Sequence, residues 1–255
     1  FAKVPVIIGS AADEAHWNFV GYPQSNIMTD DAEQISLDKY TIVLRSFWCA
    51  EKRQRTCRPS DIDAILERYP CDSRGLCSSA VVAVISDSFA CKTTQFARSL
   101  ARVTPTFTYK WNWRDPSCAA ELAHFPLSWG AHHLSELQFI FAPFSNCTYS
   151  SRGAAVADAW ASFLGGLLDD GAPGAVDGVE WPRYDAEGAH PRLVLGNFGS
   201  EASRPWLSVE DDDETPEVCA FWEGLFWSPA AEDADYRPFD DREKAEERAA
   251  AAGDP

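Results

Sequence analysis

The chain has 255 residues, 45% of them hydrophobic and 13% aromatic, which indicates a globular protein with a sizeable core rather than a disordered chain. Its formal net charge of -17 would repel phosphate backbones and anionic lipid, so nucleic acid and membrane surfaces are not expected partners. No apolar run approaches the ~18 residues that a membrane span needs, so we expect no transmembrane helix.

The first expected element is a buried strand over residues 4–8, an uninterrupted apolar run that ends at Gly9. Phe1 begins almost inside this strand. The sequence there has neither a basic segment nor a small-residue cleavage site, so it is not a signal peptide. We therefore expect the natural N-terminus to lie upstream of Phe1.

Helical and strand patterns then alternate along the chain. The helices are expected over residues 27–48, 60–69, 80–103, 154–168 and 217–226, and the further strands over 106–113 and 193–195. Ser60 is the expected N-cap of the second helix, and Pro70 ends it. In residues 106–113 aromatic side chains alternate with polar ones. This mixture of helices with buried and alternating strands predicts an α/β fold.

The C-terminal part of the sequence has a different character. Residues 210–214 form an acidic run, and residues 240–252 form a polar, alanine-rich helical pattern, so both are expected on the solvated surface. We divide the chain into a domain over residues 1–228 and an acidic, alanine-rich tail over residues 229–255.

The eight cysteines favour disulfides over a metal site. None of them forms a C-x2-C pair, which argues against zinc. Disulfides imply an oxidising compartment. The triplet Asn146-Cys147-Thr148 is a glycosylation sequon, so Asn146 is a candidate glycosylation site. Together these features favour a secreted or extracellular protein.

Two residues could carry acid–base chemistry. Glu14 follows the first strand, at the sheet edge where catalytic groups gather in α/β proteins, although a carboxylate there could also serve the first turn of a helix. His133 could take and return a proton near neutral pH, but chemistry alone does not separate it from the adjacent His132. The sequence contains no Gly-x-Ser-x-Gly, so this chain lacks a serine nucleophile elbow.

Five blocks of sequence resemble the type-B carboxylesterase and cholinesterase family. The segment PVIIGSAADE, ending at Glu14, is similar to the family's P-x-L-x-G-x-N-x-D-E-G, with Ala15 in place of the last glycine. The segment GAHHLSELQFIF, from Gly130, is similar to G-x-x-H-G-x-E-[LI]-x-[FY]-[VI]-F, with Leu134 in place of the second glycine. Three further matches are the family's D-x-x-F-x-C over residues 86–91, W-x-x-F…G-x-P…WP-x-Y over 160–184 and C-x-F-W over 219–222.

The resemblance implies the C-terminal half of an α/β-hydrolase fold, a mostly parallel sheet flanked by helices. It implies a Ser-His-Glu mechanism in which Glu14 is the acid, His133 is the base, and the serine belongs to the upstream half. The substrate would be a small-molecule carboxylic ester, with no metal or organic cofactor. Trp17 aligns with an aromatic residue that lines the substrate gorge in cholinesterases, or it packs in the core.

The resemblance also implies a disulfide. In the cholinesterase branch the cysteines at the positions of Cys91 and Cys219 are joined. Proximity in the sequence suggests three further pairs, which are Cys71–Cys77, Cys118–Cys147 and Cys49–Cys57.

Two other classes stay open. A non-catalytic, extracellular binding or adhesion module of the same fold is favoured by the missing serine, whereas the presence of both Glu14 and His133 argues against it. A zinc-binding Cys/His protein is not supported by the spacings. Because half of a parallel sheet leaves a strand edge and apolar faces uncovered, we also expect this segment alone to be poorly stable or to aggregate.

Overall fold

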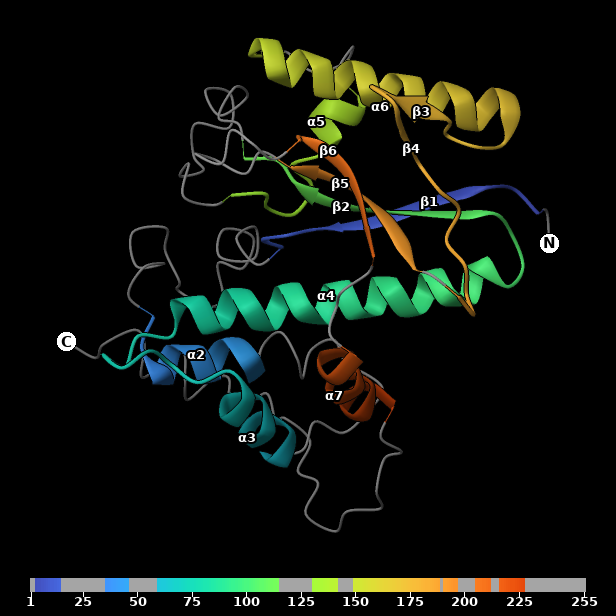
Figure 1. The fold of residues 1–255 in the computed structure, drawn as a ribbon. Coiled ribbons are helices and arrows are strands. Elements are labelled where there is room, and N and C mark those ends of the chain that lie inside the picture. The colour runs from blue at the N-terminus through green and yellow to red at the C-terminus, as the bar shows by residue number, and fades with distance from the viewer. Residues whose placement is uncertain are drawn as a thin grey trace.

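The computed structural model describes residues 3–14, 35–45, 59–114, 130–141, 149–188, 190–196, 205–211 and 216–227. These ranges form a twisted sheet with helices on both faces (Figure 1). Helix α6 (Ser151–Asp170) and the short α5 (Leu137–Ile140) lie on one side of the sheet. Helix α4 (Ser78–Ala101) covers the other side, and α2 (Leu37–Leu44), α3 (Pro59–Arg68) and α7 (Pro216–Trp227) lie beyond it.

The main sheet has four strands in the order β1-β2-β5-β6. These are β1 (Val6–Ala11), β2 (Thr106–Asn112), β5 (Pro191–Gly196) and β6 (Leu207–Asp211). The first three are parallel, and β6 runs antiparallel to β5. Parallel neighbours need a crossover connection, which α4 supplies between β1 and β2 and α6 supplies between β2 and β5.

Strand β1 begins and ends later than its apolar run predicts. Val4 and Pro5 precede the strand, and Gly9, Ser10 and Ala11 belong to it. The last three pair in register with Tyr109, Lys110 and Trp111 of β2. The partner strand therefore sets the length of β1, whereas hydropathy marks only its apolar part. This extension brings the end of β1 close to the candidate acid.

The alternation in β2 predicts its bounds to within one residue, but its polar face is not exposed. Thr106 and Thr108 are both buried, as expected of a strand that helices cover on both faces. Their hydroxyls are satisfied by backbone carbonyls: Thr106 Oγ1 donates to Thr104 at 3.1 Å and Thr108 Oγ1 donates to Pro191 at 2.9 Å. The threonine face is thus part of the interior.

Most expected helices are present with shifted ends. Helix α6 starts before its apolar pattern because Ser150 caps it, accepting a hydrogen bond from Gly153 N at 3.0 Å. It ends at Gly171, whose φ of 75° suits the left-handed cap. Ser60 was expected to cap α3, and this was wrong. The helix already includes Pro59, which has no N–H to satisfy and favours the first helical position.

Sequence patterns did not predict four short elements. These are α5, β6 and the two strands of a hairpin, β3 (Ala175–Val176) and β4 (Val179–Glu180). The start of the acidic run lies on β6, where Glu210 and Asp211 are exposed, and charges on an edge strand oppose pairing with another chain. Residues 27–34, 46–48 and 240–252 of the expected helices lie outside the described ranges, as does the proposed tail.

Two hydrophobic clusters hold the layers together. One packs the sheet against α6 and includes Trp111, Trp160 and Phe163. The other lies between α4 and the outer helices and includes Val81 and Trp222. Among the helices within the described ranges, none is both long enough and apolar enough to cross a membrane.

Both disulfides of the described region were expected. Cys91 and Cys219 join α4 to α7, and Cys71 and Cys77 close a short loop before α4. The other expected pairs, Cys118–Cys147 and Cys49–Cys57, lie outside the described residues, as does Asn146.

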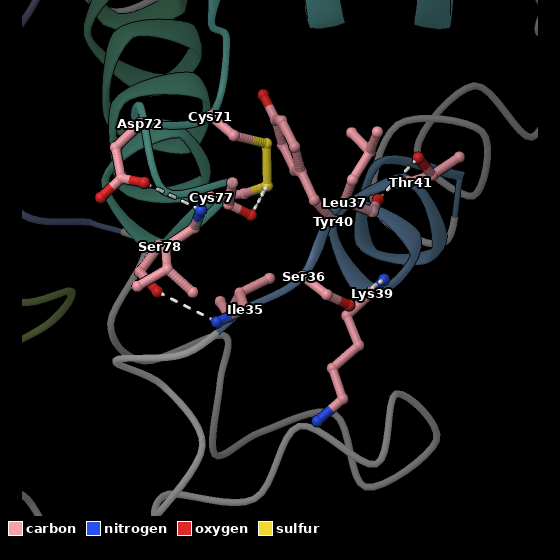
Figure 2. The surroundings of a disulfide bond; sticks show 12 residues. Ile35, Ser36, Leu37, Lys39, Tyr40, Thr41, Cys71, Asp72, Cys77 and Ser78 are labelled. Carbon is pink, nitrogen blue, oxygen red and sulfur yellow. Dashed lines mark hydrogen bonds between the residues drawn. A yellow bond between two sulfur atoms is a disulfide. The ribbon is translucent and has the colours of Figure 1, made fainter.

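The Cys71–Cys77 loop lies between α3 and α4, and hydrogen bonds join its end to the residue before Ser36, the N-cap of α2 (Figure 2). Cys77 N donates to Ile35 O at 2.8 Å, and Ile35 N donates to Ser78 Oγ at 3.2 Å. Inside the loop, the Asp72 carboxylate accepts hydrogen bonds from the backbone of Arg74 and Leu76, each at 2.9 Å. These bonds lower the pKa of Asp72, that of Leu76 being the largest cause.

Candidate active site

Glu14 lies just beyond the C-terminal end of β1, in a turn. The residue is 95% buried. One carboxylate oxygen accepts a hydrogen bond from Ala11 N at 2.6 Å. The other lies 2.5 Å from Nδ1 of His133. The carboxylate is therefore fixed by the backbone on one side and directed at an imidazole on the other.

His133 belongs to a turn that precedes α5. Its side chain is about one-third exposed, so part of the ring faces outward from the buried carboxylate. The ring of Phe89, on α4, packs edge-on against it with centroids 5.7 Å apart. With Nδ1 facing Glu14, Nε2 is the nitrogen left for proton exchange with another group.

The surroundings of His133 favour its charged form. The hydrogen bond with Glu14 raises the pKa of His133, partial burial opposes this, and the charges of Glu14 and Glu136 add to the rise. His132 differs, because burial lowers its pKa and its Nδ1 lies 3.0 Å from the carbonyl of His133. The structure therefore pairs Glu14 with His133, the histidine that the family resemblance selects.

Asp13 ties the histidine turn to the end of β1. Its backbone N donates to Ala131 O at 3.0 Å, and its carboxylate accepts from Ala131 N at 2.9 Å. Arg114, just after β2, forms an ion pair with the same carboxylate at 3.0 Å. Gly130 has a φ of 61°, and an added Cβ there would collide with the Asp13 carboxylate, so the close approach requires glycine.

Strand β2 holds the other side of the turn. Trp111 Nε1 donates to Ser135 Oγ at 2.7 Å in the interior. Tyr109 donates its hydroxyl to Glu136 Oε1 at 3.2 Å. Burial raises the pKa of Glu136, and the charge of Glu14 raises it further. The histidine turn is thus fastened at both ends to neighbouring parallel strands.

Leu134, directly after His133, has a φ of 66°, a left-handed conformation that disfavours side chains with a Cβ. It stands where the family resemblance expects glycine, and its side chain is partly exposed. The leucine therefore has a backbone conformation that glycine adopts at no steric cost.

Sequence reasoning predicted Glu14 and His133 as site residues, and the structure places them in contact. It gave no role to some of the residues that hold them in place. Asp13, Tyr109 and the pair Trp111–Ser135 had no assigned role. The signal for Tyr109 and Trp111 was their alternation on a strand, but alternation does not tell which residues these side chains contact. Trp17 lies outside the described residues. Within the described ranges, no three His, Cys, Asp or Glu side chains are grouped as a metal site.

A comparison with known families shows which family the sequence matches. The model of the carboxylesterase family matches residues 1–200. No curated protein matches the sequence.

Solved structures share the fold at low identity. The chain is similar to a PNB esterase (18% identity, TM-score 0.56), to juvenile hormone esterase from Manduca sexta with OTFP covalently attached (15%, 0.59) and to a thermophilic PNB esterase (17%, 0.55). The matches cover 86%, 88% and 86% of this chain but only 38%, 41% and 38% of those structures. The sheet and its helices are therefore part of an α/β-hydrolase fold, as the resemblance predicts.

Proposed function

This chain belongs to the carboxylesterase family, and we propose that it supplies the acid and the base of a carboxylic ester hydrolase. The observation that carries the proposal is the 2.5 Å contact between Glu14 Oε2 and His133 Nδ1. The chain spans about two-fifths of the length of the esterase structures it resembles, and it has no Gly-x-Ser-x-Gly. The nucleophilic serine is accordingly assigned to a further segment of the complete protein.

The chemistry follows from the orientation of the imidazole. His133 Nε2 takes the serine proton as the hydroxyl oxygen attacks the ester carbonyl, and the resulting tetrahedral intermediate expels the alcohol, which receives that proton. Water, deprotonated by the same nitrogen, then hydrolyses the acyl-enzyme and returns the serine with its proton. Glu14 holds the ring in the correct tautomer and stabilises the imidazolium in both steps. His133 and Glu14 end each cycle unchanged.

The covalent OTFP adduct named for the juvenile hormone esterase structure supports a mechanism with a covalent step in a relative of this fold. We assign small-molecule carboxylic esters as the substrate class because esterases are the structural relatives. The disulfides Cys71–Cys77 and Cys91–Cys219 support an oxidising compartment, and we propose that the protein is secreted.

The test uses the complete protein that contains this chain. Hydrolysis of p-nitrophenyl acetate should fall by about 10⁴-fold in Glu14→Gln and by about 10⁶-fold in His133→Ala, the order of loss seen when the acid or the base of such triads is replaced. Glu210→Gln on the exposed end of β6 and His190→Gln before β5 are the matched controls and should retain turnover. Folding of each variant is checked by circular dichroism. Undiminished turnover in either site variant would refute the assignment.

A second function is favoured by the absence of the serine elbow from this chain. A non-catalytic binding or adhesion module of the same fold would keep the sheet and need neither Glu14 nor His133. Labelling of the complete protein with a fluorophosphonate separates the two functions. A labelled serine that depends on His133 supports the hydrolase, whereas no labelling and no ester turnover support the binding module.

A further inference from the structure

The imidazole of His133 lies where two layers of the fold meet. Its turn is fastened to β2 and precedes α5, on one side of the sheet, whereas the Phe89 ring beside it belongs to α4, on the other side (Figure 1). The centroids of the two rings are 5.7 Å apart, and their planes are inclined at 61°. His133 is therefore held by a ring contact from α4 in addition to its hydrogen bond with Glu14.

One hydrogen bond does not fix the plane of an imidazole ring. The contact between His133 Nδ1 and Glu14 Oε2 fixes one atom of the ring. The outer torsion of a histidine side chain is broad, so the ring can still tilt about that contact and displace Nε2. An edge-on aromatic contact has a preferred geometry and opposes such a tilt. Phe89 therefore supplies a second restraint, which acts on the ring plane.

The Phe89 ring is itself held in place. It packs against the hydrophobic cluster between α4 and the outer helices. The ammonium group of Lys92, one helical turn later, lies 5.9 Å from the centroid of the same ring, within the range of a cation–π contact. Two positions after Phe89, Cys91 joins α4 to α7 by a disulfide. The ring that contacts His133 therefore belongs to a packed and cross-linked helix.

We propose that Phe89 is a positioning residue for the base: its ring holds the plane of the His133 imidazole, so that Nε2 stays directed at the reacting atoms while Nδ1 stays on Glu14. Phe89 exchanges no proton, and it acts only through the ring of His133. Its effect on turnover rests on the proposed function, whereas its effect on the contact between His133 and Glu14 does not.

Two other roles of Phe89 would have different consequences. If its ring lined the site for the ester, its loss would weaken substrate binding and raise KM with kcat unchanged. If the ring only filled the hydrophobic cluster, its loss would lower the free energy of unfolding and leave both constants unchanged. Loss of a positioning residue instead lowers kcat, because a misplacement of about 1 Å in the catalytic geometry can cost about 10²-fold.

The first measurement is ester turnover by the complete protein with Phe89→Leu, which keeps an apolar side chain but removes the flat ring. With p-nitrophenyl acetate, kcat should fall by about tenfold while KM stays within about twofold of the wild-type value. Phe89→Tyr keeps the ring and should retain most of kcat. Phe96→Leu is the matched control, because it makes the same substitution at an exposed position of the same helix, and it should leave both constants unchanged.

The second measurement does not depend on activity. In the complete protein labelled with ¹⁵N at histidine, the proton on Nδ1 of His133 is assigned as the low-field NMR signal that is missing from His133→Asn. Its exchange with water should be about tenfold faster in Phe89→Leu than in Phe96→Leu, because a ring that is free to tilt opens its contact with Glu14 more often.

Equal kcat and equal proton exchange in Phe89→Leu and Phe96→Leu would overturn the proposal, as would a rise in KM alone. If the wild type hydrolyses no ester, the proposed function fails, and exchange of the Nδ1 proton alone decides the role of Phe89. If Phe89→Leu does not fold, Phe89→Met replaces it in both measurements, with the same results expected and the same results overturning the proposal.

Discussion

Glu14 Oε2 and His133 Nδ1 lie 2.5 Å apart although 119 positions separate the two residues in the chain. The contact exists because β1 and β2 are parallel neighbours, which places the segments after their C-terminal ends at one edge of the sheet. Asp13 then joins the histidine turn to the end of β1 through two hydrogen bonds with Ala131.

The titration of His133 should depend first on Glu14. The hydrogen bond with this carboxylate is the largest cause of the raised pKa of His133. Glu14→Gln should therefore lower the His133 pKa, and by more than Glu136→Gln does. The measurement is an NMR titration of the complete protein labelled with ¹³C at the Cε1 atom of histidine, with Glu210→Gln as the control. An equal or larger effect of Glu136→Gln would mean that the order of the two carboxylates is wrong.

The same contact predicts how stability varies with pH. Because folding raises the pKa of His133, its contribution to the free energy of unfolding is complete below the unfolded value of about 6.5 and is lost as pH rises through the folded value. His133→Gln should remove this part of the dependence. Urea unfolding at pH 6 and pH 8 tests this prediction. From pH 6 to pH 8, the free energy of unfolding should fall by more in the wild type than in His133→Gln. An equal loss of unfolding free energy in the wild type and in His133→Gln would contradict the raised pKa of His133.

A side chain at Gly130 should destabilise the fold. Its φ of 61° and the adjacent Asp13 carboxylate predict that Gly130→Ala destabilises the fold by about 2–3 kcal/mol, from backbone strain plus displacement of Asp13. Gly174→Ala is the matched control, because its φ is 76° but an added Cβ meets nothing within 4 Å. It should cost about 1 kcal/mol. Equal losses in urea unfolding would show that the Asp13 contact contributes nothing.

Replacing Leu134 by glycine, the residue that the family has at this position, should stabilise the protein. Leu134→Gly relieves the left-handed strain of about 1–2 kcal/mol but increases the entropy of the unfolded chain, so the net gain should be about 0.5–1 kcal/mol. Asp177→Gly, at a φ of 50° in the β3–β4 turn, should gain less because aspartate tolerates this conformation better. Denaturant midpoints compare the two. A loss of stability in Leu134→Gly would indicate that the leucine side chain makes a contact worth more than the strain.

The two disulfides should differ in their contribution to stability. Cys91–Cys219 spans 128 positions and Cys71–Cys77 spans six. In the loop-entropy model, removing the long bridge by Cys91→Ala with Cys219→Ala should cost about 5 kcal/mol, and removing the short one about 2 kcal/mol. The Asp72 hydrogen bonds remain in the short loop and should reduce its loss further. Urea unfolding of both double variants tests whether the long bridge contributes more stability than the short one. Equal losses of unfolding free energy would contradict this prediction.

Local patterns determined much of the fold. Helices α4 and α6 and strand β2 lie within a few residues of their predicted bounds, because their apolar periodicity is long and each is bordered by glycine, proline or a capping residue. Strand β6 and helix α5 were missed for the opposite reason. The first is an acidic edge strand that exists by pairing with β5, and the second is a single turn held by Glu136 and Phe139.

For the candidate site, the sequence by itself supplied the two residue types, their place after a strand and before a helix, and a family resemblance that selects His133. Only the tertiary structure decided that Glu14 contacts His133 while His132 turns to the carbonyl of its neighbour. It alone also showed that Asp13, Tyr109 and Ser135 hold the turn between them. Periodicity records which residues are apolar, but the direction of a side chain and the partner it meets depend on how distant strands are placed side by side.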